Sequence, residues 1–263
     1  MGLVYLVLCV TVVAVSGSFN QTEARGFRAG YLDLEKEGVN MPPRLSDGGG
    51  LGVNPVRLTG GSNLGIDVSQ PLSSSDASCM VDNGYGAVII PRAFYSSGSP
   101  DKNACGSLEA GLKAGFKNAG VYMFPCPQCG SASAQFNSLT DYLNGCSAFK
   151  GKVWLDVEGS QYWLGDTTKN RNWYQDLVDS CTKSHFSCGI YSSLSQWEAL
   201  FGSSDYQYGS NLPLWYAHYD GKPSFDDFES GGLSFGGFKA YAKQYLGDQT
   251  LCSFGVDENY YPY

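Results

Sequence analysis

The chain has 263 residues, of which 43% are hydrophobic and 16% charged, a composition that suits one barrel-sized domain or two small ones. Its formal net charge of −8 argues against nucleic acid as a partner. The two histidines, His185 and His218, have no clustered Cys or His ligands near them, so we expect no metal site and no cofactor.

The first 18 residues have the pattern of a secretory signal peptide. Residues 3–15 form an apolar run that is too short to span a bilayer, and small residues follow it. No later segment is apolar enough to cross a membrane, so we expect no membrane association after cleavage. Residues 19–62 contain a glycosylation acceptor at Asn20 and several Gly and Pro clusters but no lasting apolar period. This composition predicts a flexible linker or pro-segment.

Eight cysteines remain after the expected cleavage. An even number in a secreted chain predicts four disulfides, although the spacing does not give their pairing. The segment from Cys126 to Cys129 is also typical of a zinc or redox motif. Because the chain has no second pair of this kind, structural disulfides are the preferred interpretation.

From residue 63 onward, strand and helix patterns alternate, which predicts parallel β/α units. The predicted strands cover residues 64–68, 87–94, 121–124, 153–158, 187–192, 212–219, 238–245 and 253–258. The predicted helices cover residues 72–83, 104–118, 132–143, 170–183 and 194–201. The sequence therefore predicts an α/β fold, a modified TIM-type barrel of five β/α units followed by three β-strands. This domain would span residues 63–263, with its chemistry at the carboxyl ends of the strands.

Acidic side chains stand near the ends of three predicted strands. Asp156 and Glu158 lie two residues apart on the fourth strand and so share one face. Asp67 ends the first strand and Asp257 lies near the end of the last, and these two strands are neighbours in a closed barrel of eight. A lone Asp at a strand end is more often a cap than a catalytic group, but four carboxylates would ring one mouth. Crowded carboxylates raise one another's pKa, which helps to keep one protonated as a general acid.

Over residues 64–261, the chain resembles the glycoside hydrolase family 25 lysozymes. The resemblance rests on GIDVSQ at the first strand, WLDVEG at the fourth, LPLWYAHY at the sixth, KQY at the seventh and VDENYY at the eighth. Segments such as DKNAC, VYMFP and FDDF are similar to the eukaryotic branch found in amoebae and nematodes. The resemblance implies the predicted barrel. It also implies cleavage of the β-1,4 bond between N-acetylmuramic acid and N-acetylglucosamine in bacterial peptidoglycan.

The resemblance also implies roles for the four acids. Glu158 would be the general acid that protonates the glycosidic oxygen. Asp156 would steer the substrate's 2-acetamido group as it attacks the anomeric carbon, or else a carboxylate would activate water. The sequence leaves both routes open, and the strand and face that Asp156 shares with Glu158 favour the first. Asp67 and Asp257 would tune charge and position water or sugar hydroxyls.

Five further side chains near strand ends are candidate substrate-binding residues. Arg92 would orient the acids or meet a carboxylate of the substrate, and a structural salt bridge is an equal alternative. The other four would line the sugar subsites, with core packing as the alternative for each aromatic: Tyr122, Tyr191, Trp215 and Gln244. We expect His218 to be a packed histidine rather than a catalytic base.

Two other functions fit parts of the pattern. A family 18 chitinase would carry a DxDxE ladder on the fourth strand, and here Trp154 stands where its first Asp would be. A secreted sugar-binding protein would keep the barrel without turnover, and the complete set of acids argues against it. We therefore expect a monomer that acts on bacterial peptidoglycan for digestion or antibacterial defence. It would work outside the cell or in the lumen of an acidic phagocytic or digestive compartment.

Overall fold

The structure is a computed structural model that describes residues 63–263. The expected signal peptide at 1–18, and the linker or pro-segment at 19–62 with its glycosylation acceptor, lie outside the described residues. Within the described part, no helix is long and apolar enough to cross a membrane.

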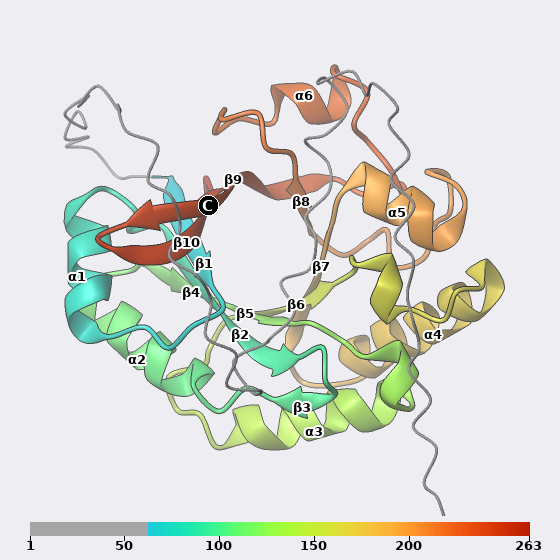
Figure 1. The fold of residues 1–263 in the computed structure, drawn as a ribbon, viewed down its shortest axis with the longest axis horizontal. Coiled ribbons are helices and arrows are strands. Elements are labelled where there is room, and N and C mark those ends of the chain that lie inside the picture. Colours follow the sequence, from blue (N-terminus) through green and yellow to red (C-terminus); the bar gives the residue numbers. More distant parts are fainter. Residues whose placement is uncertain (1–62) are drawn as a thin grey trace, which may run out of the picture. The chain divides into compact units, whose positions relative to one another are not determined.

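Eight strands close into a barrel (Figure 1). The barrel closes because β1 pairs in parallel with β2 on one side and antiparallel with β10 on the other. The eight strands are β1 (Leu64–Val68), β2 (Val88–Tyr95), β5 (Val121–Met123), β6 (Lys152–Asp156), β7 (Ser187–Ser192), β8 (Leu214–Ala217), β9 (Ala240–Leu251) and β10 (Phe254–Tyr260). Two further short strands pair with β2: β3 (Ser99–Pro100) antiparallel, and β4 (Asn118–Ala119) in parallel just before β5.

Five helices follow the first five strands of the barrel and lie around its outside (Figure 1). They are α1 (Ser74–Asp82), α2 (Ala104–Ala114), α3 (Ala132–Asn144), α4 (Thr167–Thr182) and α5 (Leu194–Phe201). Short helical turns occur at η2 (Pro127–Cys129), η3 (Ser160–Tyr162) and α6 (Asp226–Glu229). The predicted architecture of five β/α units and three further strands is therefore confirmed. The prediction missed α6, a single turn after β8.

Side-chain caps explain where four of the long helices begin. In each, a side-chain oxygen of the N-cap residue accepts a hydrogen bond from the backbone N–H three residues later. That N–H group would otherwise have no hydrogen-bond partner within the helix. These N-cap residues are Ser73, Ser131, Asp166 and Ser193.

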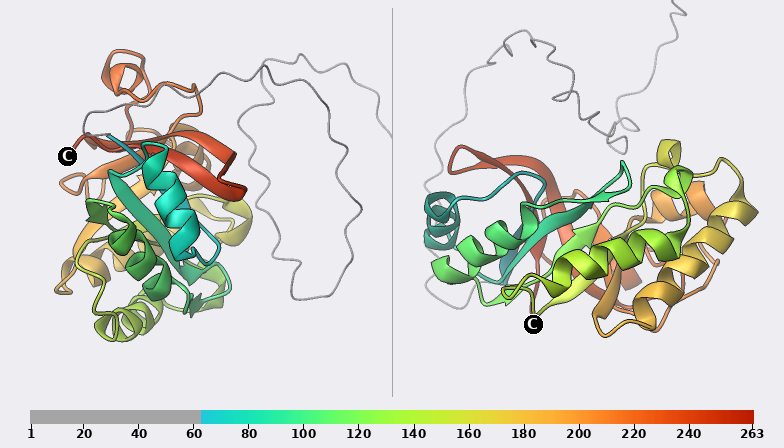
Figure 2. Two further views of the ribbon diagram at one scale, coloured as in Figure 1. Left: turned by 90° about the vertical axis from the view of Figure 1, so that its left-hand side faces the viewer. Right: turned by 90° about the horizontal axis from the view of Figure 1, so that it is seen from below.

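The last two strands differ from the prediction in their bounds and form a hairpin that the sequence did not predict. β9 and β10 form one long hairpin, in which Leu251 and Phe254 are paired across a two-residue turn. The turn residues Cys252 and Ser253 have φ of 57° and 64°, the left-handed conformation that tight hairpins require. Two residues cannot form the crossover that a parallel pair needs, so β10 must run antiparallel. Figure 2 shows this hairpin beside α1.

Four disulfides join the eight cysteines of the described chain, as the cysteine count predicted. Cys79 on α1 is bonded to Cys252, which fixes the β9–β10 turn against that helix. The segment that resembled a zinc or redox motif is a local disulfide. The bonded pairs are Cys79–Cys252, Cys105–Cys146, Cys126–Cys129 and Cys181–Cys188.

Apolar side chains alternate between two clusters along the strands. The larger cluster packs the outer faces of the strands against the helices, and the smaller one fills the barrel interior. Trp154 of β6 is 1% exposed in the interior, where its ring meets that of Trp215 edge-on at 5.7 Å. A Cβ on Gly189 would lie 2.4 Å from the Trp154 ring, and one on Gly120 would lie 3.2 Å from it. Glycines on β7 and just before β5 thus make room for this indole.

Candidate active site

Glu158 lies just beyond the end of β6. Strand-like pairing continues to this point, because the Val157 N–H donates to the Tyr191 carbonyl at 2.8 Å and the Ser192 hydroxyl donates to the Val157 carbonyl at 2.7 Å. Val157 packs in the larger cluster on the helix side, and alternation therefore places Asp156 and Glu158 on the barrel side. Asp156 is 4% exposed, whereas Glu158 is partly exposed. The strand thus presents one buried and one accessible carboxyl group.

The backbone around Glu158 is held from two sides. The Trp163 indole N–H donates to the Glu158 carbonyl at 2.9 Å, and the Gly159 N–H donates to the side-chain oxygen of Gln196 at 2.9 Å. Gly159 has φ of 70°, and a Cβ there would lie 2.8 Å from a ring carbon of Tyr162. The turn that carries Glu158 out of the strand therefore requires glycine.

Aromatic packing of α4 and α5 supports this turn. Trp163 is 3% exposed, and its ring meets Trp173 of α4 and Phe201 of α5 edge-on, each at 5.8 Å between centroids. Phe201 also packs against Trp197, at 4.6 Å. A general acid must stand within hydrogen-bond reach of the atom it protonates, and these close-packed rings restrict movement of the turn that carries Glu158.

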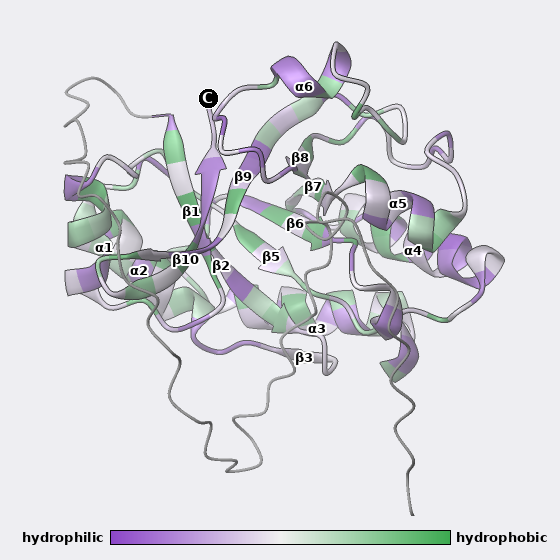
Figure 3. Ribbon diagram, turned by 45° about the horizontal axis from the view of Figure 1, so that its top comes forward, coloured by the Kyte–Doolittle hydropathy of each residue, from purple (hydrophilic) through white to green (hydrophobic). Residues whose placement is uncertain are grey.

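Asp67 and Asp257 are register partners across β1 and β10, and each is 6% exposed. The prediction that Asp257 lies near the carboxyl end of a strand is wrong, because it lies in the middle of β10. It reaches the same mouth because β10 runs antiparallel to β1. The Asp248 N–H donates to Asp257 Oδ1 at 2.6 Å. In Figure 3, β10 carries the hydrophilic colour, and its polar residues include this acid.

Two buried side-chain amides hold Asp67. Gln244 Nε2 and Asn259 Nδ2 each donate to Asp67 Oδ2 at 2.8 Å, and Gln244 Nε2 also lies 3.3 Å from Asp257 Oδ2. The orientation of Asn259 is fixed, because its oxygen accepts the indole N–H of Trp215 at 2.7 Å and an indole can only donate. An oxygen that accepts two N–H bonds has no place for a proton of its own. Oδ2 of Asp67 is therefore arranged as a hydrogen-bond acceptor.

Two phenols fix the orientation of the Gln244 amide. Tyr191 and Tyr219 each donate to Gln244 Oε1 at 2.7 Å, which turns the amide nitrogen toward the carboxylates. Tyr191 is also the register partner of Asp156 on β6. The hydrogen-bond network therefore runs from the strand beside the β6 acids to the carboxylate pair of β1 and β10. Such an arrangement suits acid-assisted cleavage of a bond held over the mouth.

Comparison with known proteins decides the family. Residues 59–245 match the sequence profile of the family described as "Lysozyme-like protein 1". "Probable GH family 25 lysozyme 2" of Dictyostelium discoideum is 40% identical over 199 residues, which are 75% of this chain and 90% of that protein. The chain belongs to the glycoside hydrolase family 25 lysozymes.

A second relative agrees with this family 25 assignment, and a solved structure shares the fold. "Lysozyme-like protein 5" of Caenorhabditis elegans is 32% identical over 202 residues, which cover 75% of this chain and 91% of that protein. The muramidase of Trichobolus zukalii has a similar fold, with a TM-score of 0.58 at 23% identity. That match covers 76% of this chain and 93% of the muramidase.

The predicted sugar-lining residues differ in burial within the family 25 barrel. Tyr191, Trp215 and Gln244 are 3%, 2% and 1% exposed and support the carboxylates through the network described above. Tyr122 on β5 is partly exposed. Direct contact of any of these four side chains with a sugar stays a prediction.

Arg92 is engaged in a structural salt bridge, which was one of the two alternatives. Its Nε lies 3.2 Å from Asp101 Oδ2, and its Nη2 donates to the Ser69 carbonyl at 2.8 Å. The guanidinium also lies 4.3 Å from the ring centroid of Tyr95. Arg92 thus ties β2 to the loop that follows β1, and a role toward the substrate stays a prediction.

The sequence did not predict the charged cluster behind β8 and β9, which we call the Lys243 cluster. Lys243 is fully buried, and its Nζ lies 2.8 Å from both Asp220 Oδ1 and Asp227 Oδ2. His218 Nδ1 lies 2.5 Å from Asp227 Oδ2, and the Tyr216 hydroxyl donates to Asp227 Oδ1 at 2.7 Å. Burial alone would raise the pKa of Asp227, but hydrogen bonds from Lys243, Tyr216 and His218 lower it to about 2.

The Lys243 cluster bears on two expectations. His218 was expected to be packed, but its side chain is 43% exposed and is paired with Asp227. The ligand-type atoms of His218, Asp220 and Asp227 lie within 4.8 Å of one another, a grouping that the sequence did not suggest. The Lys243 ammonium supplies positive charge to both carboxylates of this group.

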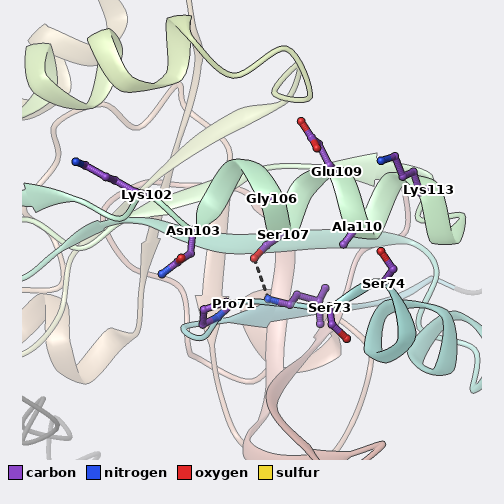
Figure 4. Close-up of a pocket in the computed structure, with 11 residues that line it drawn as sticks. Pro71, Ser73, Ser74, Lys102, Asn103, Gly106, Ser107, Glu109, Ala110 and Lys113 are labelled. Atoms are coloured by element: carbon purple, nitrogen blue, oxygen red, sulfur yellow. Dashed lines mark hydrogen bonds between the residues drawn. The ribbon is translucent and has the colours of Figure 1, made fainter.

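A groove of about 370 Å³ lies between the β1–α1 loop and α2 (Figure 4). Its floor includes Ser107, whose hydroxyl accepts the Leu72 N–H at 3.0 Å. Lys102 and Lys113 lie at its two ends in this view. None of the four acids of the barrel mouth lines the groove, so we do not assign the reaction to it.

Proposed function

We propose that this family 25 chain is a secreted N-acetylmuramidase that hydrolyses the β-1,4 bond between N-acetylmuramic acid and N-acetylglucosamine in bacterial peptidoglycan. The observation that carries the proposal is the barrel mouth. There a partly exposed Glu158 follows the buried Asp156 at the end of β6, and the buried Asp67 and Asp257 share one network of amides and phenols. The relatives named above as lysozymes and a muramidase support the same substrate. Four disulfides suit an oxidising compartment, outside the cell or in an acidic lumen.

In this proposal Glu158 is the general acid. Its exposure lets it meet the glycosidic oxygen, and its fixed backbone holds it there. As the bond between the anomeric carbon and that oxygen breaks, the proton moves from Glu158 to the leaving sugar. A water molecule later adds to the anomeric carbon, and its proton returns to Glu158.

Asp156 has two possible tasks in the proposed reaction. In the first, it steers the substrate's own 2-acetamido oxygen onto the anomeric carbon, and water then opens the cyclic intermediate. In the second, a carboxylate activates the attacking water directly, for which a carboxyl separation of roughly 6.5–9.5 Å is typical. We favour the first task, because Asp156 lies on the strand and face of the acid itself.

Asp67 and Asp257 supply fixed negative charge in this proposal. The amides of Gln244 and Asn259 both donate to Asp67 Oδ2 and hold its carboxyl group in a fixed orientation. A carboxylate near the anomeric carbon stabilises the positive charge that develops there in the transition state.

A wall-lysis assay tests the proposal directly. A suspension of purified bacterial cell walls should clear on addition of the mature protein, while a chitin suspension should release no sugars. The position of the first chitinase acid is Trp154, which is buried inside the barrel. Clearing of chitin instead of walls would favour the chitinase alternative. Binding to walls without clearing would favour a sugar-binding protein.

The lysis rate should be highest at acidic pH. Peptidoglycan is anionic and the chain has a pI near 4.7, so at neutral pH long-range forces oppose rather than drive their encounter. As the pH falls, carboxylates lose charge and a larger share of the general acid is protonated, which places the optimum at about pH 4–6. Added salt at neutral pH should leave the rate flat or raise it slightly, because it screens repulsion. The measurement is the lysis rate against pH at two ionic strengths, and a steep loss of rate with salt would contradict this expectation.

A further inference from the structure

Tyr219 follows β8 and stands out by its exposure. It is 41% exposed, and among the described residues only two other large hydrophobic side chains are exposed, Leu112 and Tyr263. Leu112 lies on α2, outside the barrel. The carbonyl of Tyr263 accepts a hydrogen bond from Asn118, which also bonds to the start of β2, at the opposite end of the barrel. Tyr219 is therefore the exposed ring of this group that borders the carboxylate mouth.

The ring of Tyr219 is held at its hydroxyl end. Its hydroxyl donates to Gln244 Oε1 at 2.7 Å, the amide that bonds to Asp67 and Asp257. A Cβ built on Gly247 would lie 3.1–3.4 Å from three ring carbons of Tyr219, so the ring packs against the bare backbone of that glycine.

The backbone of Tyr219 is fixed as well. Its neighbours His218 and Asp220 both belong to the Lys243 cluster, on the side opposite to Gln244. The His218 N–H donates to the Gln244 carbonyl at 3.1 Å, which continues the pairing of β8 with β9. An aromatic side chain that is already ordered costs little conformational entropy when a ligand packs on it.

We infer that Tyr219 is a substrate-contacting residue, whose exposed ring packs against the apolar face of a sugar in a β-1,4-linked amino-sugar glycan. Ring hydrogens of a pyranose meet the negatively polarised face of an aromatic ring favourably. The phenol, through Gln244, sets that sugar in register with Asp67 and Asp257. The inference rests on the proposed function, since it names a glycan that the same mouth would cleave.

Calorimetric titration of a non-cleaving protein tests the inference. The parent is the full mature chain with Glu158→Gln, and the probe is a soluble tetrasaccharide of alternating N-acetylglucosamine and N-acetylmuramic acid. Adding Tyr219→Leu should raise Kd about tenfold, whereas Tyr219→Phe and Tyr219→Trp, which keep an aromatic face, should stay within about threefold. Tyr263→Leu removes an exposed tyrosine at the other end of the barrel and should leave Kd unchanged.

The possible outcomes distinguish a failure of the Tyr219 inference from a failure of the proposed function. Equal Kd values for the parent and Tyr219→Leu would overturn the role of Tyr219 and leave the proposed function standing. A loss in Tyr219→Phe as large as in Tyr219→Leu would assign the contact to the hydroxyl and overturn ring packing. Absence of tetrasaccharide binding by the parent itself would count against the proposed function. If Tyr219→Leu melts far below the parent, the Phe and Trp variants decide between ring and hydroxyl.

Discussion

Replacing Glu158 by Gln is expected to lower the rate of cell-wall lysis by about 10²–10⁴-fold with the fold unchanged, because an amide has the shape of the acid but cannot deliver its proton. Two hydrogen bonds that hold this residue in the turn use its backbone carbonyl and the N–H of Gly159, and both survive the substitution. The measurements are the initial rate of turbidity loss and the melting temperature of the purified variant.

The matched control for this experiment is Glu198→Gln. Glu198 lies on α5, is exposed, and undergoes the same chemical change away from the mouth. It should lyse walls at the wild-type rate. Lysis by Glu158→Gln at the rate of this control would show that another group donates the proton.

The sequence predicted the barrel well where each unit is local. Apolar strands such as β7 and capped helices such as α5 have the bounds that their own residues indicate. The β9–β10 hairpin was mispredicted because its turn residues, Cys252 and Ser253, are not the Asn or Gly that usually mark positive φ. A turn of two residues reverses the chain, and with it the direction from which Asp257 enters the mouth.

The acids could be found from the sequence because strand ends carry them, but the groups that orient the acids could not. Asn259 meets Asp67 across 192 positions in the sequence, and only the β1–β10 register shows that they touch. One signal was available: Asn259 is two residues from Asp257 and so shares its face of the strand. The predicted sugar-lining role of Gln244 similarly missed its bonds to the carboxylates, because a strand pattern does not show hydrogen-bond partners.

The Lys243 cluster could not be predicted from the sequence either, because its contacts also join residues that only the fold brings together. Lys243 stands on an outward-facing position of β9, where a lysine would ordinarily reach solvent. It is buried because the segment from His218 to α6 folds over it and brings Asp220 and Asp227 to its ammonium group. The contact depends on the path of a loop without a periodic pattern, which residue spacing does not reveal.

Replacing Lys243 by Met is expected to lower the free energy of unfolding by about 2–4 kcal/mol. Breaking a fully buried ion pair typically costs about 3–5 kcal/mol, because the partner charges stay behind. Asp220 and Asp227 keep 19% of their side-chain surface exposed, and water therefore offsets part of the loss. The melting temperature should fall by roughly 5–15 °C. Lys222→Met, an exposed position in the same loop, should change stability by no more than about 0.5 kcal/mol.

The pH dependence of this loss identifies its cause. The pKa of Asp227 is about 2 in the folded chain against an ordinary value of 3.8, so its ionisation adds stability above about pH 4 and adds none once the pH has fallen through 2. Without Lys243 the pKa of Asp227 loses a main lowering contact, and this contribution shrinks. The difference in unfolding free energy between wild type and Lys243→Met should be full at pH 5–7 and close as the pH falls toward 2. Denaturant unfolding at several pH values measures it, and a difference that stays constant to pH 2 would assign the loss to packing of the lysine stem rather than to its charge.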